Sequence, residues 1–196
     1  EIFVFSGRGS IAVAQGDMAA ALAKSYRNFD TENFSVTYGG NDVDGVKIGY
    51  LLELAYDHFY ILYGDYGFEL TRPQEKLQWM VFDGTEAFGR YAYETEKQDL
   101  SHLKGYYSAR TNAVAVVASG KTCKWQIAAA SHPTADVIAC PADAETDITR
   151  IVHEVAHQLA FNCGLQDRGA MYPLWASEGL AMFFERSMSN EYFRSN

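Results

Sequence analysis

Hydrophobic residues recur along the chain with two different spacings, each typical of one kind of secondary structure. Over residues 46–63 the apolar positions repeat every three or four residues, which predicts a helix with one buried face. Over residues 33–38 and 76–82 apolar and polar residues alternate, which predicts strands with one buried side. Because helix-like and strand-like segments follow one another, we expect a mixed α+β fold.

Weaker patterns complete the expected secondary structure. The Asp83-Gly84 pair is expected to end the strand at 76–82 and to precede a helix at about 85–94. Residues 109–112 are expected to form the loop of a β-hairpin. The other expected elements are strands at 2–5, 105–108, 113–118 and near 137–138, and an alanine-rich helix at 17–29.

The clearest amphipathic pattern lies towards the end of the sequence. Thr146 or Asp147 could cap the start of a helix there, and Gly164 could close its end in the left-handed conformation. A last helix is expected over about 174–186, with Pro173 suited to its first turn. The apolar stripe of the first of these helices, at the spacing i, i+3, i+4, i+7, i+8 and i+11, consists of Ile148, Ile151, Val152, Val155, Ala156 and Leu159.

The motif His153-Glu154-Val155-Ala156-His157 lies in the middle of this helix. Residues four positions apart lie one turn apart on the same helix face, so His153 and His157 can bind one metal ion. Zinc accepts imidazole nitrogen and favours a tetrahedral shell of four ligands. Glu154 points to the same side and can reach a water in the open position rather than the ion, which is the role of a general base.

A catalytic zinc site needs a third protein ligand, and Glu178 is the candidate. It lies 21 residues after His157, on the expected last helix, which can pack against the HExxH helix and direct one carboxylate at the metal. A glycine inside a helix costs about 1 kcal/mol relative to alanine. Gly179 is therefore expected to mark the close approach of another element.

Together these residues resemble a known group of enzymes. HExxH at 153–157 followed by WxxEGLA at 175–181 is similar to the gluzincin metallopeptidases, and residues 146–186 look most like the bacterial peptidase MA-like family. The resemblance implies a zincin-like fold, in which a mixed sheet packs on the HExxH helix and the following helix carries the glutamate ligand. It also implies one Zn²⁺ ion held by His153, His157 and Glu178, with Glu154 as the catalytic base.

The same resemblance raises three structural questions. It implies an edge strand near the active helix for an extended peptide, and 113–118 is the candidate for that strand. Some gluzincins place an acidic residue four positions after the ligand glutamate, where it orients a histidine, but Met182 occupies that position here. The partner of the histidine must then come from elsewhere, and Glu185 is expected to be solvated on a different side of its helix. The candidates by residue type for a donor that stabilises the oxyanion are Tyr106, Tyr107, Arg168 and Tyr172.

These residues predict a zinc metallopeptidase, a hydrolase in which Glu154 activates a zinc-bound water to attack a peptide bond. The expected partner is a peptide or protein substrate. A second hypothesis is a catalytically silent, zinc-containing module that binds peptide or a cell-wall component, and a third is a scaffold with a vestigial metal site. Retention of Glu154 discriminates among them, because a purely structural site does not need that carboxylate.

Composition excludes several other classes of function. The formal net charge is −9, from 25 acidic and 16 basic residues, and an acidic surface repels phosphate backbones, so nucleic acid is excluded as a partner. No stretch reaches the roughly 18 uninterrupted apolar residues of a membrane span. The three cysteines, Cys123, Cys140 and Cys163, lack CxxC spacing, which disfavours a cysteine zinc site. Either Cys123 pairs with Cys140 or all three are buried thiols.

The length of 196 residues is consistent with one zincin-like domain over 1–196. Residues 1–30 could be an N-terminal extension, and a C-terminal helical subdomain of the kind that many gluzincins carry could be missing. The sequence begins at Glu1 without an initiator methionine, which suggests a processed or trimmed protein. A secreted or periplasmic location is slightly favoured on this basis.

Overall fold

The computed structural model describes residues 26–39, 45–118, 126–128, 137–140 and 145–195, which contain a large sheet and a small one. The strands of the large sheet are β1 (Tyr26–Asp30), β2 (Phe34–Gly39), β3 (Leu77–Phe82), β4 (Gly105–Ser108) and β5 (Ala113–Val117). Their spatial order is β1-β2-β3-β5-β4. The three central strands are parallel, whereas the edge strands β1 and β4 are antiparallel to their neighbours. The small sheet consists of β6 (Gln126–Ala128), β7 (Val137–Cys140) and β8 (Phe193–Ser195).

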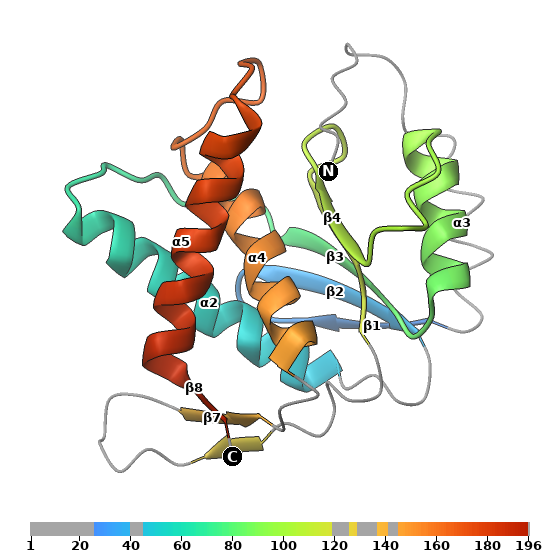
Figure 1. The fold of residues 1–196 in the computed structure, drawn as a ribbon, viewed down its shortest axis with the longest axis horizontal. Coiled ribbons are helices and arrows are strands. Elements are labelled where there is room, and N and C mark those ends of the chain that lie inside the picture. Colours follow the sequence, from blue (N-terminus) through green and yellow to red (C-terminus); the bar gives the residue numbers. More distant parts are fainter. Residues whose placement is uncertain (1–25, 40–44, 119–125, 129–136, 141–144, 196) are drawn as a thin grey trace.

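Helices cover both faces of the large sheet. The helices of the described residues are α2 (Gly45–Asp65), α3 (Thr85–Glu96), α4 (Glu145–Asn162) and α5 (Leu174–Tyr192). Figure 1 shows α2, α4 and α5 grouped on one side of the sheet and α3 on the other. The expected α+β class with a mixed sheet is therefore confirmed.

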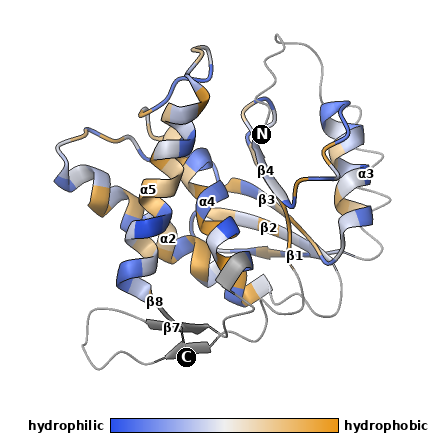
Figure 2. Cartoon of the chain, in the orientation of Figure 1, coloured by the Kyte–Doolittle hydropathy of each residue, from blue (hydrophilic) through white to orange (hydrophobic). Residues whose placement is uncertain are grey.

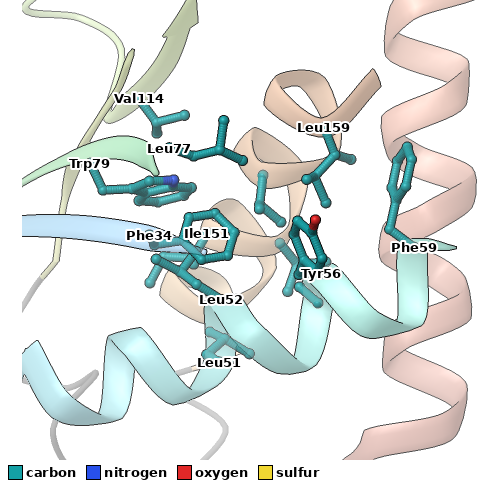
Figure 3. Packing of buried hydrophobic residues seen from close by; sticks show 14 of the residues in the cluster. Phe34, Leu51, Leu52, Tyr56, Phe59, Leu77, Trp79, Val114, Ile151 and Leu159 are labelled. Carbon is teal, nitrogen blue, oxygen red and sulfur yellow. The ribbon is translucent and has the colours of Figure 1, made fainter. Parts of the chain in front are cut away.

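The alternating pattern of β3 decides which side chains enter the main core. Leu77, Trp79 and Val81 are almost fully buried against the helices α2 and α4, while Met80 and Phe82 join a smaller apolar cluster under α3. Figure 3 shows the main core, in which sheet residues such as Trp79 meet α2 and α4. Apolar and polar residues both occur along α2, α4 and α5 (Figure 2), as expected of helices with one buried side.

A buried glutamine fixes the rotation of α4 on the sheet. The indole Nε1 of Trp79 donates a hydrogen bond of 2.8 Å to Oε1 of Gln158, which is fully buried. Nε2 of Gln158 in turn donates to the backbone oxygen of Asn112, at 3.0 Å. A buried polar group left without its partner costs about 1–3 kcal/mol, so this arrangement resists rotation of the helix. Gln158 follows His157 directly, and the network therefore helps to set the direction of the HExxH face.

Most of the expected elements are found, with changes at several ends. The helix expected at 17–29 is wrong at its last residues, because 26–29 belong to β1, where pairing with β2 outweighs the local helical pattern. The last helix continues to Tyr192 rather than ending at 186, and Pro173 stands just before it, at the N-cap position. Helix α4 starts at Glu145, so the expected capping residues 146 and 147 lie inside its first turn. The expected strand at 2–5 and residues 17–25 lie outside the described residues.

Two smaller expectations concern cysteines and membranes. Cys163 is a buried free thiol. The candidate pairing of Cys123 with Cys140 falls on Cys123, which lies outside the described residues. Among the helices that the structure describes, none combines the length and the apolar character needed to span a bilayer.

Candidate metal centre

Helix α4 presents its HExxH residues between the sheet and α5. His157 is 2% exposed and Glu154 is 3% exposed, so both lie within the protein. The side chain of His153 is partly buried, at 15% exposure. The apolar stripe of α4 faces the core, with Ile148, Ile151, Val152, Val155, Ala156 and Leu159 almost completely buried. The sequence pattern thus gives the correct orientation of this helix.

The structure brings His153, His157 and Glu178 together as a group that could hold a metal ion. The Nε2 atoms of the two histidines lie 3.2 Å apart. Oε2 of Glu178 lies 3.2 Å from Nε2 of His153, and Oε1 lies 3.4 Å from Nε2 of His157. The three side chains, from two helices, can therefore each offer one donor atom to a single ion, and these atoms lie within 4.8 Å of one another. Two imidazole nitrogens and a carboxylate oxygen are donors that suit a divalent transition metal.

Glu154 is held in a different environment beside this group. The pKa of Glu154 is raised to about 7, mainly by burial; the positive charge of His153 lowers it, and the nearby charge of Glu178 adds to the rise. A hydrogen bond from the backbone of Tyr107 also lowers the pKa, because it stabilises the ionised carboxylate. The chain thus holds a carboxyl group whose pKa lies near neutrality next to three candidate ligands.

Glu185 is a residue of this site that the sequence analysis placed wrongly. Oε2 of Glu185 lies 3.3 Å from Nδ1 of His153, and the Glu185 side chain is only 29% exposed. The expectation that it is solvated on another side of the helix is therefore wrong. The signal was present in the spacing, because residues seven apart lie two turns apart on nearly the same helix face, so Glu178 and Glu185 share one side of α5. Met182, four positions after Glu178, is 62% exposed.

Gly179 does not mark a close approach. A Cβ atom built at Gly179 would have no neighbour within 4 Å, and the residue is exposed, so this expectation is also wrong. Helix α5 is anchored instead through its other side. Ser177 accepts a hydrogen bond of 2.8 Å from the buried Gln166, and the Tyr63 hydroxyl donates to the backbone oxygen of Leu180, at 3.2 Å. These contacts fix the first two turns of α5, where Glu178 lies.

The structure separates one of the four candidate oxyanion donors from the others. Tyr106 belongs to the cluster under α3, where its hydroxyl lies 3.2 Å from Oγ1 of Thr95, on the far side of the sheet from α4. Tyr107, the next residue of β4, belongs to the core on the α4 side. The three remaining candidates each make a hydrogen bond within the protein. The Tyr107 hydroxyl donates to Oδ1 of Asn112 at 3.1 Å, and Arg168 donates to Oδ1 of Asn162 at 2.6 Å. The Tyr172 hydroxyl accepts a hydrogen bond of 2.9 Å from the backbone N–H of Asp167.

The edge strand next to α4 is β4 and not the segment 113–118 that the sequence analysis favoured. Strand β5 is paired on both sides, with β3 and with β4, so it is internal. Strand β4 has only one partner in the described sheet. The backbone hydrogen bond from Tyr107 to Glu154 shows that this edge lies directly beside the HExxH helix, and Figure 1 shows β4 alongside α4.

A comparison with protein families matches the C-terminal part of the sequence. A model of the family described as "Protein of unknown function (DUF1570)" matches residues 147–194, about a quarter of the chain. The matched segment contains the HExxH motif, Glu178 and Glu185. A comparison with curated proteins gives no match.

Proposed function

We propose that this chain is a zinc-dependent peptidase of the gluzincin type, with His153, His157 and Glu178 as zinc ligands and Glu154 as the general base. The observation that carries the proposal is the position of Glu154. This buried carboxyl group lies next to the His-His-Glu group and accepts a hydrogen bond from the backbone of Tyr107, on the edge strand β4 of the described sheet. A site that only held a metal for stability would not need such a group.

The spacing of the candidate donor atoms is compatible with zinc in a tetrahedral shell. Ligand atoms at about 2.0–2.1 Å from a tetrahedral ion lie roughly 3.3–3.4 Å from one another. The two imidazole Nε2 atoms lie 3.2 Å apart, close to that value. The Glu178 carboxylate lies beside both rings, with Oε2 3.2 Å from Nε2 of His153 and Oε1 3.4 Å from Nε2 of His157. Three protein ligands with one position left for water is the composition of a catalytic rather than a structural zinc site. The resemblance of HExxH and WxxEGLA to the gluzincins supports the same assignment.

Glu154 would move the proton in the reaction. A zinc ion held by His153, His157 and Glu178 would supply a Lewis acid, which would make a bound water more acidic and polarise the carbonyl group of the scissile bond. The Glu154 carboxylate takes a proton from the attacking water and later passes it to the leaving amine, so that a neutral amine and a carboxylic acid result. A carboxyl group whose pKa is near 7 can accept and release a proton at neutral pH, which suits both steps.

The edge strand favours a peptide as the substrate. An extended peptide can join the edge of a sheet as an additional strand, held by backbone hydrogen bonds. Strand β4 offers such an edge, and its residue Tyr107 is bonded directly to Glu154. A peptide aligned on β4 would therefore run past the general base and the metal ligands.

The test combines metal analysis with turnover of peptide libraries. Wild type is expected to contain about one zinc ion per chain, which His157→Ala and Glu178→Ala lose. Glu154→Gln is expected to retain zinc but to lose essentially all turnover, because the amide cannot take the proton from water. Turnover that persists in Glu154→Gln would refute the mechanism. A wild type that holds zinc but cleaves no peptide would instead favour the silent binding module.

A further inference from the structure

We infer that Glu185 is a positioning residue of the metal site, which holds the His153 ring with its Nε2 atom directed at the ion. The inference rests on the proposed function, because it assumes that the His-His-Glu triad binds a metal. It assigns to a residue seven positions after Glu178 the role that Met182, four positions after it, cannot perform, because a thioether is at most a weak hydrogen-bond acceptor.

Two carboxylates of α5 contact the two nitrogens of one imidazole ring. Oε2 of Glu178 lies 3.2 Å from Nε2 of His153, and Oε2 of Glu185 lies 3.3 Å from Nδ1 of the same ring. The two glutamates are separated by two helical turns, or about 10 Å along the axis, and their side chains converge on the histidine between them. The ring is thereby held by a candidate ligand at one nitrogen and by Glu185 at the other.

The chemistry of imidazole gives these two contacts different roles. A neutral ring has one N–H and one lone pair, and it binds a metal only through the nitrogen that carries the lone pair. Nε2 of His153 faces Glu178 and His157, so a ring that binds the ion through Nε2 carries its proton on Nδ1, where the proton needs an acceptor. The Glu185 carboxylate is that acceptor, and such a partner fixes the tautomer and orientation of the ring and makes Nε2 a stronger ligand.

The position of Glu185 is set by its neighbours on the helix rather than by this contact alone. Phe184 and Met188, on either side of it, are completely buried in the core. The side chain of Ser187 is hydrogen-bonded to His58 of α2, with 2.8 Å between Oγ of Ser187 and Nε2 of His58. This turn of α5 is therefore anchored to α2, and the Glu185 side chain leaves a fixed backbone to reach His153.

Metal affinity measured on three variants tests this inference. Glu185→Met keeps the length of the side chain but removes the carboxylate, whereas Glu185→Gln keeps an oxygen acceptor and removes only the charge. Glu191→Gln removes the same charge from an exposed position on the same helix and is the matched control. The zinc dissociation constant is measured by competition with a chromophoric chelator, and the His153 ring nitrogens are observed by NMR in the zinc-loaded proteins.

We expect Glu185→Met to weaken zinc binding by about 10–100-fold, the usual effect of removing the partner of a ligating histidine. Glu185→Gln should weaken zinc binding by a smaller factor, and Glu191→Gln should bind zinc as tightly as wild type. In the NMR experiment, wild type should show a hydrogen-bonded proton on Nδ1 of His153. The unfolding midpoints of the metal-free variants should match that of Glu191→Gln, which separates positioning of the ligand from a general effect on stability.

Unchanged zinc affinity in Glu185→Met, or an equal loss in Glu191→Gln, would overturn the inference. If Glu185→Met does not fold, the comparison of Glu185→Gln with Glu191→Gln decides, and equal affinities there would overturn it. Failure of the inference and failure of the proposed function give different results. If wild type binds zinc but cleaves no peptide, the peptidase proposal fails and the inferred role of Glu185 stands. If wild type takes up no zinc, both the peptidase proposal and the inferred role of Glu185 are refuted.

Discussion

Glu154 and Glu178 carry the same functional group but lie in different surroundings. Glu178 lies beside two histidine rings, and its side chain is 24% exposed. Glu154 is almost fully buried, and the burial raises its pKa to about 7. The difference between the two carboxyl groups therefore comes from their surroundings and not from residue type.

Among single residues, His58 should make the free energy of unfolding depend on pH. Burial lowers the pKa of His58 below its usual value of 6.5, and the charge of Glu191 offsets this in part. Below pH 6.5 the unfolded chain takes up a proton that the folded chain resists, so stability should be complete above this pH and fall as the pH drops through it. Between pH 7.5 and pH 5, the free energy of unfolding measured in urea should fall less in His58→Gln than in wild type. The matched control is His102→Gln, which changes an exposed histidine, and curves for wild type and His58→Gln that stay parallel would contradict the prediction.

At the scale of elements, the site depends on the packing of α5 against α4. Helix α5 supplies Glu178 and Glu185, and α4 supplies the two histidines and Glu154. The buried side of α5 (Ser177, Ala181, Phe184 and Met188) settles its rotation. Both glutamates lie at the border of this buried side, which is why they reach α4 while Met182 points outwards.

Two glycines near these helices should respond to alanine in opposite ways. Gly179 lies inside α5 with open space around its Cβ position, so Gly179→Ala should stabilise the protein by roughly 0.5–1 kcal/mol through higher helix propensity. Gly164 has a φ of +91°, which an alanine adopts only with strain, so Gly164→Ala should destabilise the protein by about 1–2 kcal/mol. Chemical unfolding of the metal-free proteins measures both values. If both substitutions changed the free energy of unfolding in the same direction, local backbone conformation would not determine the effect of alanine at these positions.

At the scale of the molecule, a metal ion would join helices α4 and α5, which belong to a single core with α2 and the sheet. An ion that binds only the folded state would therefore stabilise the whole protein against unfolding. The two helices come from segments separated by the loop 163–173, so the complete site exists only in the folded chain.

Zinc should accordingly raise the thermal unfolding midpoint. With free zinc at 100 times its dissociation constant, the stabilisation is about 2.7 kcal/mol, and a domain of this size gains about 2–4 °C per kcal/mol. A chelator should reverse the shift, and His157→Ala should show none. Differential scanning calorimetry with and without zinc checks this, and an equal shift in His157→Ala would place the responsible ion elsewhere.

The sequence alone predicted the features that depend on local periodicity. The helix at 46–63, the strands at 33–38 and 76–82, the hairpin and the buried stripe of α4 all match the structure, because each pattern repeats with the period of its element. The motif spacing also singled out His153, His157 and Glu178, which the structure brings together.

Only the tertiary structure decided the features that depend on contacts between distant segments. Pairing with β2 made residues 26–29 a strand, and the order of the sheet made β4, not β5, the edge beside α4. The contact of Glu185 with His153 joins residues 32 positions apart, and the open space at Gly179 is a property of its surroundings. Periodicity fixes the side of a helix on which a residue lies, but the packing of the core determines what that side meets.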